Sequence, residues 1–299
     1  MIKVIFLGTS AQIPTKERNH TGILLTYKEE NILVDCGEGT QRQFRKAELN
    51  PCKITKILLT HRHGDHVFGL PGLLSTLNFS EYNKELIIYG PKGIKRFLEE
   101  FLGISTMKWN FKIKVEEVTD KKFFETGDFY LEAESMQHGV PTNAYNFVIK
   151  DKLRIDKSKL KKYKIKEGPL LKKLKEGKNI TYNSKEYKAN ELTYLEKGKK
   201  ISFILDTLQN NKIEPFVKDA DLLICESSFS EELNEIAKEH LHLTSEQAGK
   251  IAKKAKAKKL ILTHISQRYE NNQKLLLAEA KKNFKETSIV KDFDVLEVK

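Results

Sequence analysis

The chain has 299 residues, of which 39% are hydrophobic and 31% are charged. This composition is typical of a soluble globular protein, and no stretch approaches the roughly 18 apolar residues of a transmembrane helix, so we expect no membrane association. The cysteines Cys36, Cys52 and Cys225 are scattered and odd in number. They argue against a disulfide framework or a cysteine zinc ribbon and favour a reducing cytoplasm.

The formal charge of +12 is concentrated in one segment. Residues 151–200 contain 17 Lys and Arg against 7 Asp and Glu, a net charge of +10, so the rest of the chain carries only +2. A near-neutral body with one strongly basic segment indicates contact with a polyanion. The alternative is a solvated, lysine-rich insertion without a partner.

Short apolar runs with β-branched residues recur along the chain and predict core strands. They are interspersed with segments of helical periodicity, which indicates a layered α/β fold rather than an all-β barrel. The predicted strands are residues 4–7, 23–25, 32–34, 57–59, 86–88, 201–205, 222–224 and 260–262, and the predicted helices are residues 40–47, 70–77, 93–101, 245–255 and 272–284.

The basic segment interrupts this pattern. It has few apolar residues, many lysines, and a break at Gly168-Pro169. Because so little apolar surface is available for burial, we expect residues 151–196 to form a protruding, partly mobile arm. We therefore predict a single domain of residues 1–299 that carries this inserted arm, and no second domain.

Residues 61–66 read His-Arg-His-Gly-Asp-His and follow a predicted strand. On a helix, ligands of one ion would lie three or four residues apart, so this spacing favours a loop. In a loop His61 and His63 can both face one metal ion, while Asp65 and His66 face a second. Imidazoles with carboxylates suit Zn²⁺, and paired ions are a common device for phosphoester hydrolysis. The alternative is a loop of four solvated polar residues.

Other metal-competent side chains follow predicted strands in distant parts of the chain. Because strand ends from distant segments meet at one edge of a sheet, a shared site there is geometrically natural. Any one of them could by itself be a core histidine or a helix-capping aspartate, but five such placements indicate one site. The five residues are Asp35, His61, His138, Asp206 and His264.

With these residues in view, the chain resembles the metallo-β-lactamase superfamily, and within it the tRNase Z family of endonucleases. The H-x-H-x-D-H motif alone marks only the superfamily. Three further segments carry the narrower resemblance: the P-x-K-x-R-N pattern of residues 14–19, the D-x-G-E-G-T-Q pattern of residues 35–41, and Gly168-Pro169 in the basic insertion. The resemblance implies an αβ/βα four-layer sandwich with a flexible basic arm.

The resemblance also implies two zinc ions per subunit, although Mn²⁺ suits the same ligands. Three ligands would hold each ion and one carboxylate would bridge them. The implied ligands are His61, His63 and His138 for one ion, Asp65, His66 and His264 for the other, and Asp206 as the bridge. Asp35 would hydrogen-bond to a metal-bound histidine and orient its ring.

For catalysis, the resemblance implies that Asp65 orients the attacking water and that Glu226 holds His242, which delivers a proton to the leaving oxygen. The chain departs from the family here: it has Cys-Glu-Ser-Ser at residues 225–228 where the family often has H-E-A-T. It has His-Leu-Thr from His242 where the family often has H-S-T. His240 is an alternative proton donor.

The implied substrate is precursor tRNA, cut after the discriminator nucleotide to leave a tRNA 3′-hydroxyl and a trailer 5′-phosphate. The arm would contact phosphates without reading bases, and a homodimer would let the arm of one subunit serve the site of the other. The candidate RNA contacts are Lys16, Arg18 and Asn19 beside the trailer, and Gly168, Pro169, Lys172 and Lys173 in the arm.

Two alternatives remain open on the sequence alone. A superfamily hydrolase of small phosphodiesters or thioesters explains the metal site but leaves the basic segment without a purpose. A non-catalytic RNA-binding relative explains the basic segment, but it gives no reason for an intact set of ligands or for the pair Glu226 and His242.

Overall fold

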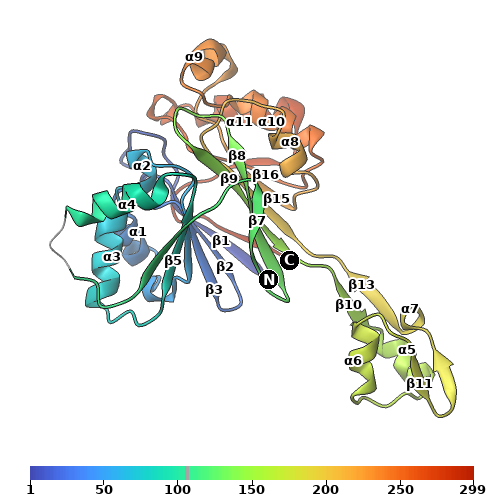
Figure 1. The fold of residues 1–299 in the computed structure, drawn as a ribbon. Helices are drawn as coiled ribbons and strands as arrows, with labels where there is room; N and C mark the ends of the chain where they lie inside the picture. The colour runs from blue at the N-terminus through green and yellow to red at the C-terminus, as the bar shows by residue number, and fades with distance from the viewer. Residues whose placement is uncertain (105–107) are drawn as a thin grey trace. The chain divides into compact units, whose positions relative to one another are not determined.

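The computed structural model describes residues 1–104 and 108–299 (Figure 1). Contacts divide the chain into two compact units. The larger unit comprises residues 1–124, 131–147 and 200–299, and the smaller comprises residues 125–130 and 148–199. None of the helices in the described ranges is long and apolar enough to cross a membrane.

The first seven-stranded sheet has the order β18-β1-β2-β3-β4-β5-β6. Strand β1 runs antiparallel to both β18 and β2, whereas β3 to β6 are parallel to one another, with their carboxyl ends at one edge. The strands are β1 (Ile2–Gly8), β2 (Gly22–Tyr27), β3 (Glu30–Val34), β4 (Lys56–Leu58), β5 (Leu86–Gly90), β6 (Ile113–Glu117) and β18 (Val295–Val298).

The second seven-stranded sheet has the order β17-β16-β15-β14-β9-β8-β7. Its strands β14 to β17 are parallel, so their carboxyl ends also share one edge. The strands are β7 (Lys121–Glu125), β8 (Phe129–Met136), β9 (Thr142–Ile149), β14 (Lys200–Ile204), β15 (Leu222–Glu226), β16 (Leu260–Thr263) and β17 (Thr287–Ile289).

Helices cover the outer face of each sheet (Figure 1). Buried side chains of α1, α3 and α4 join the core of the first sheet, and those of α8, α10 and α11 join that of the second. The helices are α1 (Thr40–Lys46), α2 (Gly64–Val67), α3 (Leu70–Phe79), α4 (Ile94–Gly103), α8 (Ile213–Phe216), α9 (Asn234–Glu239), α10 (Ser245–Lys254) and α11 (Gln273–Asn283), with 3₁₀ turns η1 (Pro51–Lys53), η2 (Glu231–Leu233) and η3 (Gln267–Tyr269).

The two sheets face each other across an inner core of buried side chains. The rings of Tyr27 and Phe147 meet edge to face across it, with centroids 5.6 Å apart. The Tyr145 hydroxyl donates a hydrogen bond of 2.7 Å to the carbonyl oxygen of Leu59. The result is helix, sheet, sheet, helix, which confirms the predicted four-layer sandwich.

The smaller unit differs from the expectation of an arm without a core. Leu160, Leu174, Ile180 and Leu192 are almost fully buried in a small cluster of its own. Each such side chain contributes about 1.5–3 kcal/mol by burial, so this cluster stabilises the smaller unit. Its elements are β10 (Lys152–Ile155), α5 (Lys157–Lys162), α6 (Leu170–Lys175), β11 (Ile180–Tyr182), β12 (Lys185–Tyr187), α7 (Ala189–Leu192) and β13 (Thr193–Glu196).

Candidate active site

Three carboxylate or imidazole residues lie just beyond the carboxyl ends of strands and have left-handed backbones. Asp35 follows β3 with φ of 57°, Asp206 follows β14 with φ of 25°, and His264 follows β16 with φ of 55°. This conformation costs a residue other than glycine about 1–3 kcal/mol, so it persists only where surrounding contacts enforce it. The strain aims all three side chains at one place.

The H-x-H-x-D-H motif divides between a loop and a helix. His61 and His63 lie in the predicted loop after β4, but Asp65 and His66 belong to the single turn of α2. Gly64 begins this turn, and a Cβ atom there would lie 2.3 Å from the ring of Phe68. The two halves of the motif belong to different metal-competent groups, His61 and His63 to one and Asp65 and His66 to the other.

Four ligand atoms of the first group converge near His63. Its Nδ1 lies 3.0 Å from His61 Nε2 and 3.2 Å from His138 Nε2. Asp206 Oδ2 lies 3.6 Å from His61 Nε2. Ligand atoms of these four residues all lie within 4.8 Å of one another. Burial and the neighbouring His66 lower the pKa of His61 well below its usual value, so its imidazole is neutral and can bind a metal.

A second group shares Asp206 with the first. His264 Nε2 lies 3.2 Å from Asp206 Oδ1 and 3.4 Å from Asp65 Oδ2, and His66 Nε2 lies 3.3 Å from Asp65 Oδ2. All four of these residues are buried. Asp65 Oδ2, His66 Nε2, Asp206 Oδ1 and His264 Nε2 have no hydrogen-bond partner. Buried polar atoms are rarely left in this state, and a cation at their centre would satisfy them.

Asp35 and Thr60 orient the imidazoles of His66 and His61. They do so through hydrogen bonds to Nδ1, the ring nitrogen that faces away from the site. Asp35 Oδ2 accepts a hydrogen bond of 2.7 Å from His66 Nδ1. The Thr60 hydroxyl donates its proton to the same oxygen at 2.8 Å, so at His61 Nδ1, 3.0 Å away, it can only accept. Both rings therefore carry a proton on Nδ1 and turn Nε2 toward the site.

The rings of His138 and His264 are oriented in the same way, through hydrogen bonds from Nδ1. His138 Nδ1 donates to the carbonyl oxygen of Leu241 at 3.1 Å. Ser228 donates to Glu226 Oε2 at 2.7 Å, and its oxygen lies 2.9 Å from His264 Nδ1, from which it accepts. His138 and His264 thus also present Nε2. Ring nitrogens and carboxylate oxygens therefore converge on one place, which is the arrangement of a metal centre.

Beside this centre, Glu226 holds His242 in a buried pair. Glu226 Oε2 accepts from His242 Nδ1 at 2.9 Å, and Glu226 Oε1 accepts from the backbone N–H of Thr207 at 2.7 Å. Burial opposes protonation of His242, but the carboxylates of Glu226 and Asp206 outweigh it and raise the pKa to about 9. His240, the alternative proton donor, is instead exposed and packs parallel to the ring of Phe229.

The loop of residues 14–19 has one exposed cation and one buried cation. Lys16 is exposed. Arg18 is only 3% exposed, and its guanidinium donates to Thr9 Oγ1, to the carbonyl oxygen of Val290 and to Gln273 Oε1 at 2.6–2.7 Å. These hydrogen bonds engage both terminal nitrogens of the Arg18 guanidinium. Asn19 is held through its side-chain amide, which donates to the carbonyl oxygen of Glu38 at 2.8 Å.

The other predicted RNA contacts lie in the smaller unit. Pro169 is the N-cap residue of α6, directly after Gly168. Lys172 and Lys173 are exposed on that helix, whereas Leu174 turns into the small core. The helix therefore presents its lysines to solvent while its apolar side holds the unit together.

Known proteins were compared with the chain over its whole length. Ribonuclease Z of Nanoarchaeum equitans is 40% identical over 296 residues, which cover 99% of this chain and 93% of that protein. Ribonuclease Z of Listeria monocytogenes is 40% identical and covers 99% of both chains. The chain belongs to the Ribonuclease Z family.

Two further matches agree with the fold of this Ribonuclease Z family member. The crystal structure of the short form of human tRNase Z has a TM-score of 0.73 with 28% identity and covers 99% of both chains. The metallo-β-lactamase fold protein YhfI of Bacillus subtilis has a TM-score of 0.71 with 22% identity. The family model of the anti-Pycsar protein Apyc1 matches residues 2–164, a range that ends before Asp206.

Sequence reasoning missed Ser228 and Thr60 in this Ribonuclease Z family site. Both are small hydroxyl residues that bond to a carboxylate and an imidazole from different strands. A sequence signal existed for each, since Thr60 precedes the motif and Ser228 closes the Cys-Glu-Ser-Ser segment. Neither signal names the distant partner, which is Asp35 for Thr60 and His264 for Ser228, 25 and 36 residues away along the chain.

Proposed function

We propose that this chain is a metal-dependent endoribonuclease that removes the 3′ trailer of precursor tRNA after the discriminator nucleotide. One observation carries the proposal: identity of about 40% to Ribonuclease Z proteins extends over nearly the whole chain. The matched span thus covers both halves of the metal-competent cluster and the Glu226–His242 pair. The buried ligand atoms without hydrogen-bond partners described above support a metal centre at this position.

The chemistry of the donors fits two Zn²⁺ ions, and Mn²⁺ is the alternative. Such ions would supply positive charge to the phosphate and lower the pKa of a bound water. We assign the ligands as His61, His63 and His138 for one ion, Asp65, His66 and His264 for the other, and Asp206, which belongs to both groups, as the bridge.

Asp65 is the residue we assign to the attacking water. Its Oδ2 is buried without a hydrogen-bond partner between His66 and His264. Burial opposes its ionisation, but His66 and His264 outweigh burial and hold the pKa of Asp65 below its usual value. An ionised carboxylate at this point can accept a hydrogen bond from water and so orient its lone pair toward phosphorus.

His242 is the residue we assign to the leaving oxygen. Glu226 accepts its Nδ1 proton, so the Nε2 side of the ring can donate to the departing 3′ oxygen. Proton donation is needed there because a free alkoxide is a poor leaving group. The products are a tRNA with a 3′-hydroxyl and a trailer with a 5′-phosphate.

The smaller unit supplies contacts to tRNA in this proposal. Its exposed lysines, among them Lys172 and Lys173 beside Gly168-Pro169, can neutralise phosphates of any sequence. In the larger unit we assign Lys16 to RNA contact, while Arg18 and Asn19 hold the shape of the loop. We propose that the enzyme acts as a homodimer in the reducing cytoplasm, where its three free cysteines stay unoxidised.

Incubation of the purified protein with one unprocessed precursor tRNA tests the function. We expect a single cut after the discriminator nucleotide, mapped at nucleotide resolution, with a phosphate on the trailer. A chromogenic phosphodiester serves as the reference substrate. If the protein hydrolyses that ester efficiently and leaves precursor tRNA intact, it is a small-phosphodiester hydrolase and the proposal is wrong.

A further inference from the structure

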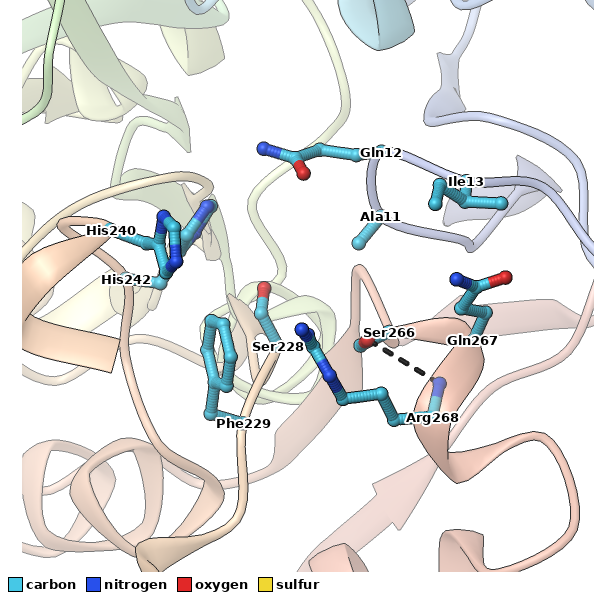
Figure 2. A pocket seen from close by; sticks show the side chains of 10 residues that line it. All are labelled: Ala11, Gln12, Ile13, Ser228, Phe229, His240, His242, Ser266, Gln267 and Arg268. Carbon is cyan, nitrogen blue, oxygen red and sulfur yellow. Dashed lines mark hydrogen bonds between the residues drawn. The ribbon is translucent and has the colours of Figure 1, made fainter. Parts of the chain in front are cut away.

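The proposed proton donor and one proposed metal ligand depend on the same short segment, residues 241–245. The segment lies between α9 and α10 and includes the first residue of α10. The carbonyl oxygen of Leu241 accepts from His138 Nδ1 at 3.1 Å. The next residue, His242, borders a pocket of about 130 Å³, and Figure 2 shows its imidazole across that pocket from Gln267. A shift of this segment would therefore displace His242 and weaken the hydrogen bond from His138 together.

The backbone of the segment is strained at its start. Leu241 has φ of 58°, a left-handed conformation that is unfavourable for a residue other than glycine and persists only where surrounding contacts enforce it. Part of this support is local, since the His242 N–H donates to the carbonyl oxygen of Ala237 at 2.8 Å and Leu243 is buried. Further support comes from the other end of the segment, where it enters α10.

Two carboxylates bind that end of the segment. Glu279 of α11 is only 5% exposed, and its Oε2 accepts from Ser245 Oγ and, at 3.0 Å, from the backbone N–H of Glu231. Glu231 Oε2 in turn accepts from Thr244 Oγ1 at 2.6 Å. One buried carboxylate oxygen of α11 therefore links the start of α10 to the turn η2.

Close packing of α10 against α11 fixes the position of Glu279. A Cβ atom at Gly249 would lie 2.5 Å from the carbonyl oxygen of Ala280, so the two helices meet there without room for a side chain. Ala280 follows Glu279, and Gly249 lies about one helical turn after Ser245 on the same side of α10. The partial positive charge at the start of α10 also favours a carboxylate beside Ser245. Glu279 is therefore an acceptor that the helix packing holds in place.

We propose that Glu279 is a positioning residue for the proposed reaction and acts on residues 241–245 through its hydrogen bonds. This inference rests on the proposed function. Glu279 itself touches neither substrate nor metal. It keeps His242 facing the leaving oxygen and keeps the Leu241 carbonyl facing His138. A catalytic group that moves by about 1 Å can lose about a hundredfold in rate, so hydrogen bonds at this distance still affect the proton transfer.

Glu279→Ala is compared with wild type on two substrates at saturating Zn²⁺. For precursor tRNA we expect kcat to fall about 10- to 100-fold while KM stays within a few-fold, because the acid is misplaced and the tRNA contacts are distant. A chromogenic phosphodiester whose leaving group has a low pKa needs little proton donation, so its cleavage should stay within a few-fold of wild type. Equal losses on both substrates would indicate general destabilisation and would overturn the positioning role.

Metal affinity gives a second readout that does not depend on activity. Titration with a competing chelator should show an affinity about 3- to 10-fold lower in Glu279→Ala, less than the roughly 10- to 100-fold that loss of a hydrogen bond behind a ligating histidine usually costs. The effect is smaller because the bond from His138 to Leu241 is weakened rather than removed. An unchanged metal affinity overturns the part of the inference that concerns His138.

Two milder variants test the same contact where Glu279→Ala folds poorly. Ser245→Ala removes one of the two donors to the carboxylate oxygen, so we expect a selective loss of about 3- to 10-fold on precursor tRNA. Glu279→Gln keeps an oxygen acceptor in the same place and should stay within a few-fold of wild type on both substrates. A Glu279→Gln protein as slow as Glu279→Ala, or a Ser245→Ala protein that cuts precursor tRNA like wild type, overturns the role.

Glu30→Ala is the matched control. Glu30 lies on β3, and its Oε2 likewise accepts two hydrogen bonds, from Thr55 Oγ1 and Lys56 Nζ. We expect this variant to lose stability but to keep the wild-type ratio of the two cleavage rates. A ratio changed as in Glu279→Ala would overturn the inference, because any such carboxylate would then have the same effect. A wild type that cleaves the ester but leaves precursor tRNA intact overturns the proposed function instead, and metal affinity then still tests Glu279.

Discussion

Glu226 binds His242 through a hydrogen bond of 2.9 Å, and the same carboxylate oxygen accepts the proton of Ser228 at 2.7 Å. Ser228 in turn accepts from the buried ring of His264. One carboxylate thus orients both the proposed proton donor and, through a hydroxyl, a proposed metal ligand. The proposed proton donor His242 and the proposed metal centre share one buried hydrogen-bond network. A substitution at either of them should therefore alter the properties of the other.

His242→Ala should slow cleavage of precursor tRNA by about 10²–10⁴-fold, the usual contribution of a general acid. Because the lost step is protonation of the leaving oxygen, a substrate with a leaving group of low pKa should recover much of the rate. Single-turnover kinetics on phosphodiesters with graded leaving groups measures this. His240→Ala is the matched control, since that ring has no contact with Glu226 among the described residues, and equal rescue in both variants would argue against the assignment.

Asp65→Ala should reduce cleavage by roughly a thousandfold or more, because it removes both a metal ligand and the acceptor for the attacking water. tRNA affinity, which depends on distant lysines, should stay within a few-fold of wild type. Filter binding and cleavage assays on the same preparation separate the two effects. A purified Asp65→Ala protein that cuts like wild type would show that the ligand assignment is wrong.

Ser228→Ala should weaken metal binding by about 10–100-fold, the usual cost of losing a hydrogen bond behind a ligating histidine. It leaves His264 Nδ1 and one oxygen of Glu226 without their shared partner. Ser228→Thr keeps the hydroxyl and is the control. Titration with a competing chelator gives the metal affinity directly, without reference to activity, and identical affinities for the two variants would exclude the role of Ser228.

Removal of metal should destabilise the protein. Without a cation, the four buried atoms of the second group, on Asp65, His66, Asp206 and His264, lack hydrogen-bond partners. A ligand that binds only the folded state stabilises it by RT ln(1 + [L]/Kd), so we expect a chelator, which removes the metal, to lower Tm by roughly 5–15 °C. Differential scanning calorimetry with and without chelator measures the shift, and added Zn²⁺ should reverse it. An unchanged Tm would contradict a resident metal.

Deletion of residues 151–196 should raise KM for precursor tRNA far more than it slows a chromogenic phosphodiester. The larger unit keeps its own core in this variant, so its chemistry should survive. Binding of the intact protein should weaken with salt, with a slope of about 0.7 to 0.9 per phosphate neutralised. Equal losses on both substrates would show that the segment is structural.

A milder version replaces only Lys172 and Lys173 by alanine. Their loss should raise KM and reduce the salt slope by about two phosphate contacts. Lys281→Ala with Lys282→Ala, two exposed lysines on α11, removes the same charge from the larger unit. If the control pair raises KM as much, net charge alone explains the binding of tRNA.

The sequence by itself determined where the main strands run and which metal-competent side chains come together. Predicted strands such as residues 32–34 and 201–205 agree with β3 and β14, because local apolar patterning is enough to define a buried strand. A polar residue that directly follows such a strand must lie at the edge of the sheet, because the strand ends there. This is why the sequence alone places Asp35 and Asp206 at one site, where His66 contacts both carboxylates.

Only the tertiary structure decided the contacts between distant segments. Arg18 looks like an RNA contact in its loop, yet its guanidinium is taken up by Val290 and Gln273, more than 250 residues away. The basic insertion looks too polar to fold, yet its few apolar residues meet in one cluster around Leu174. Periodicity records which face of an element is apolar, but not what will lie against that face. Which residues an element contacts is therefore decided by the tertiary structure.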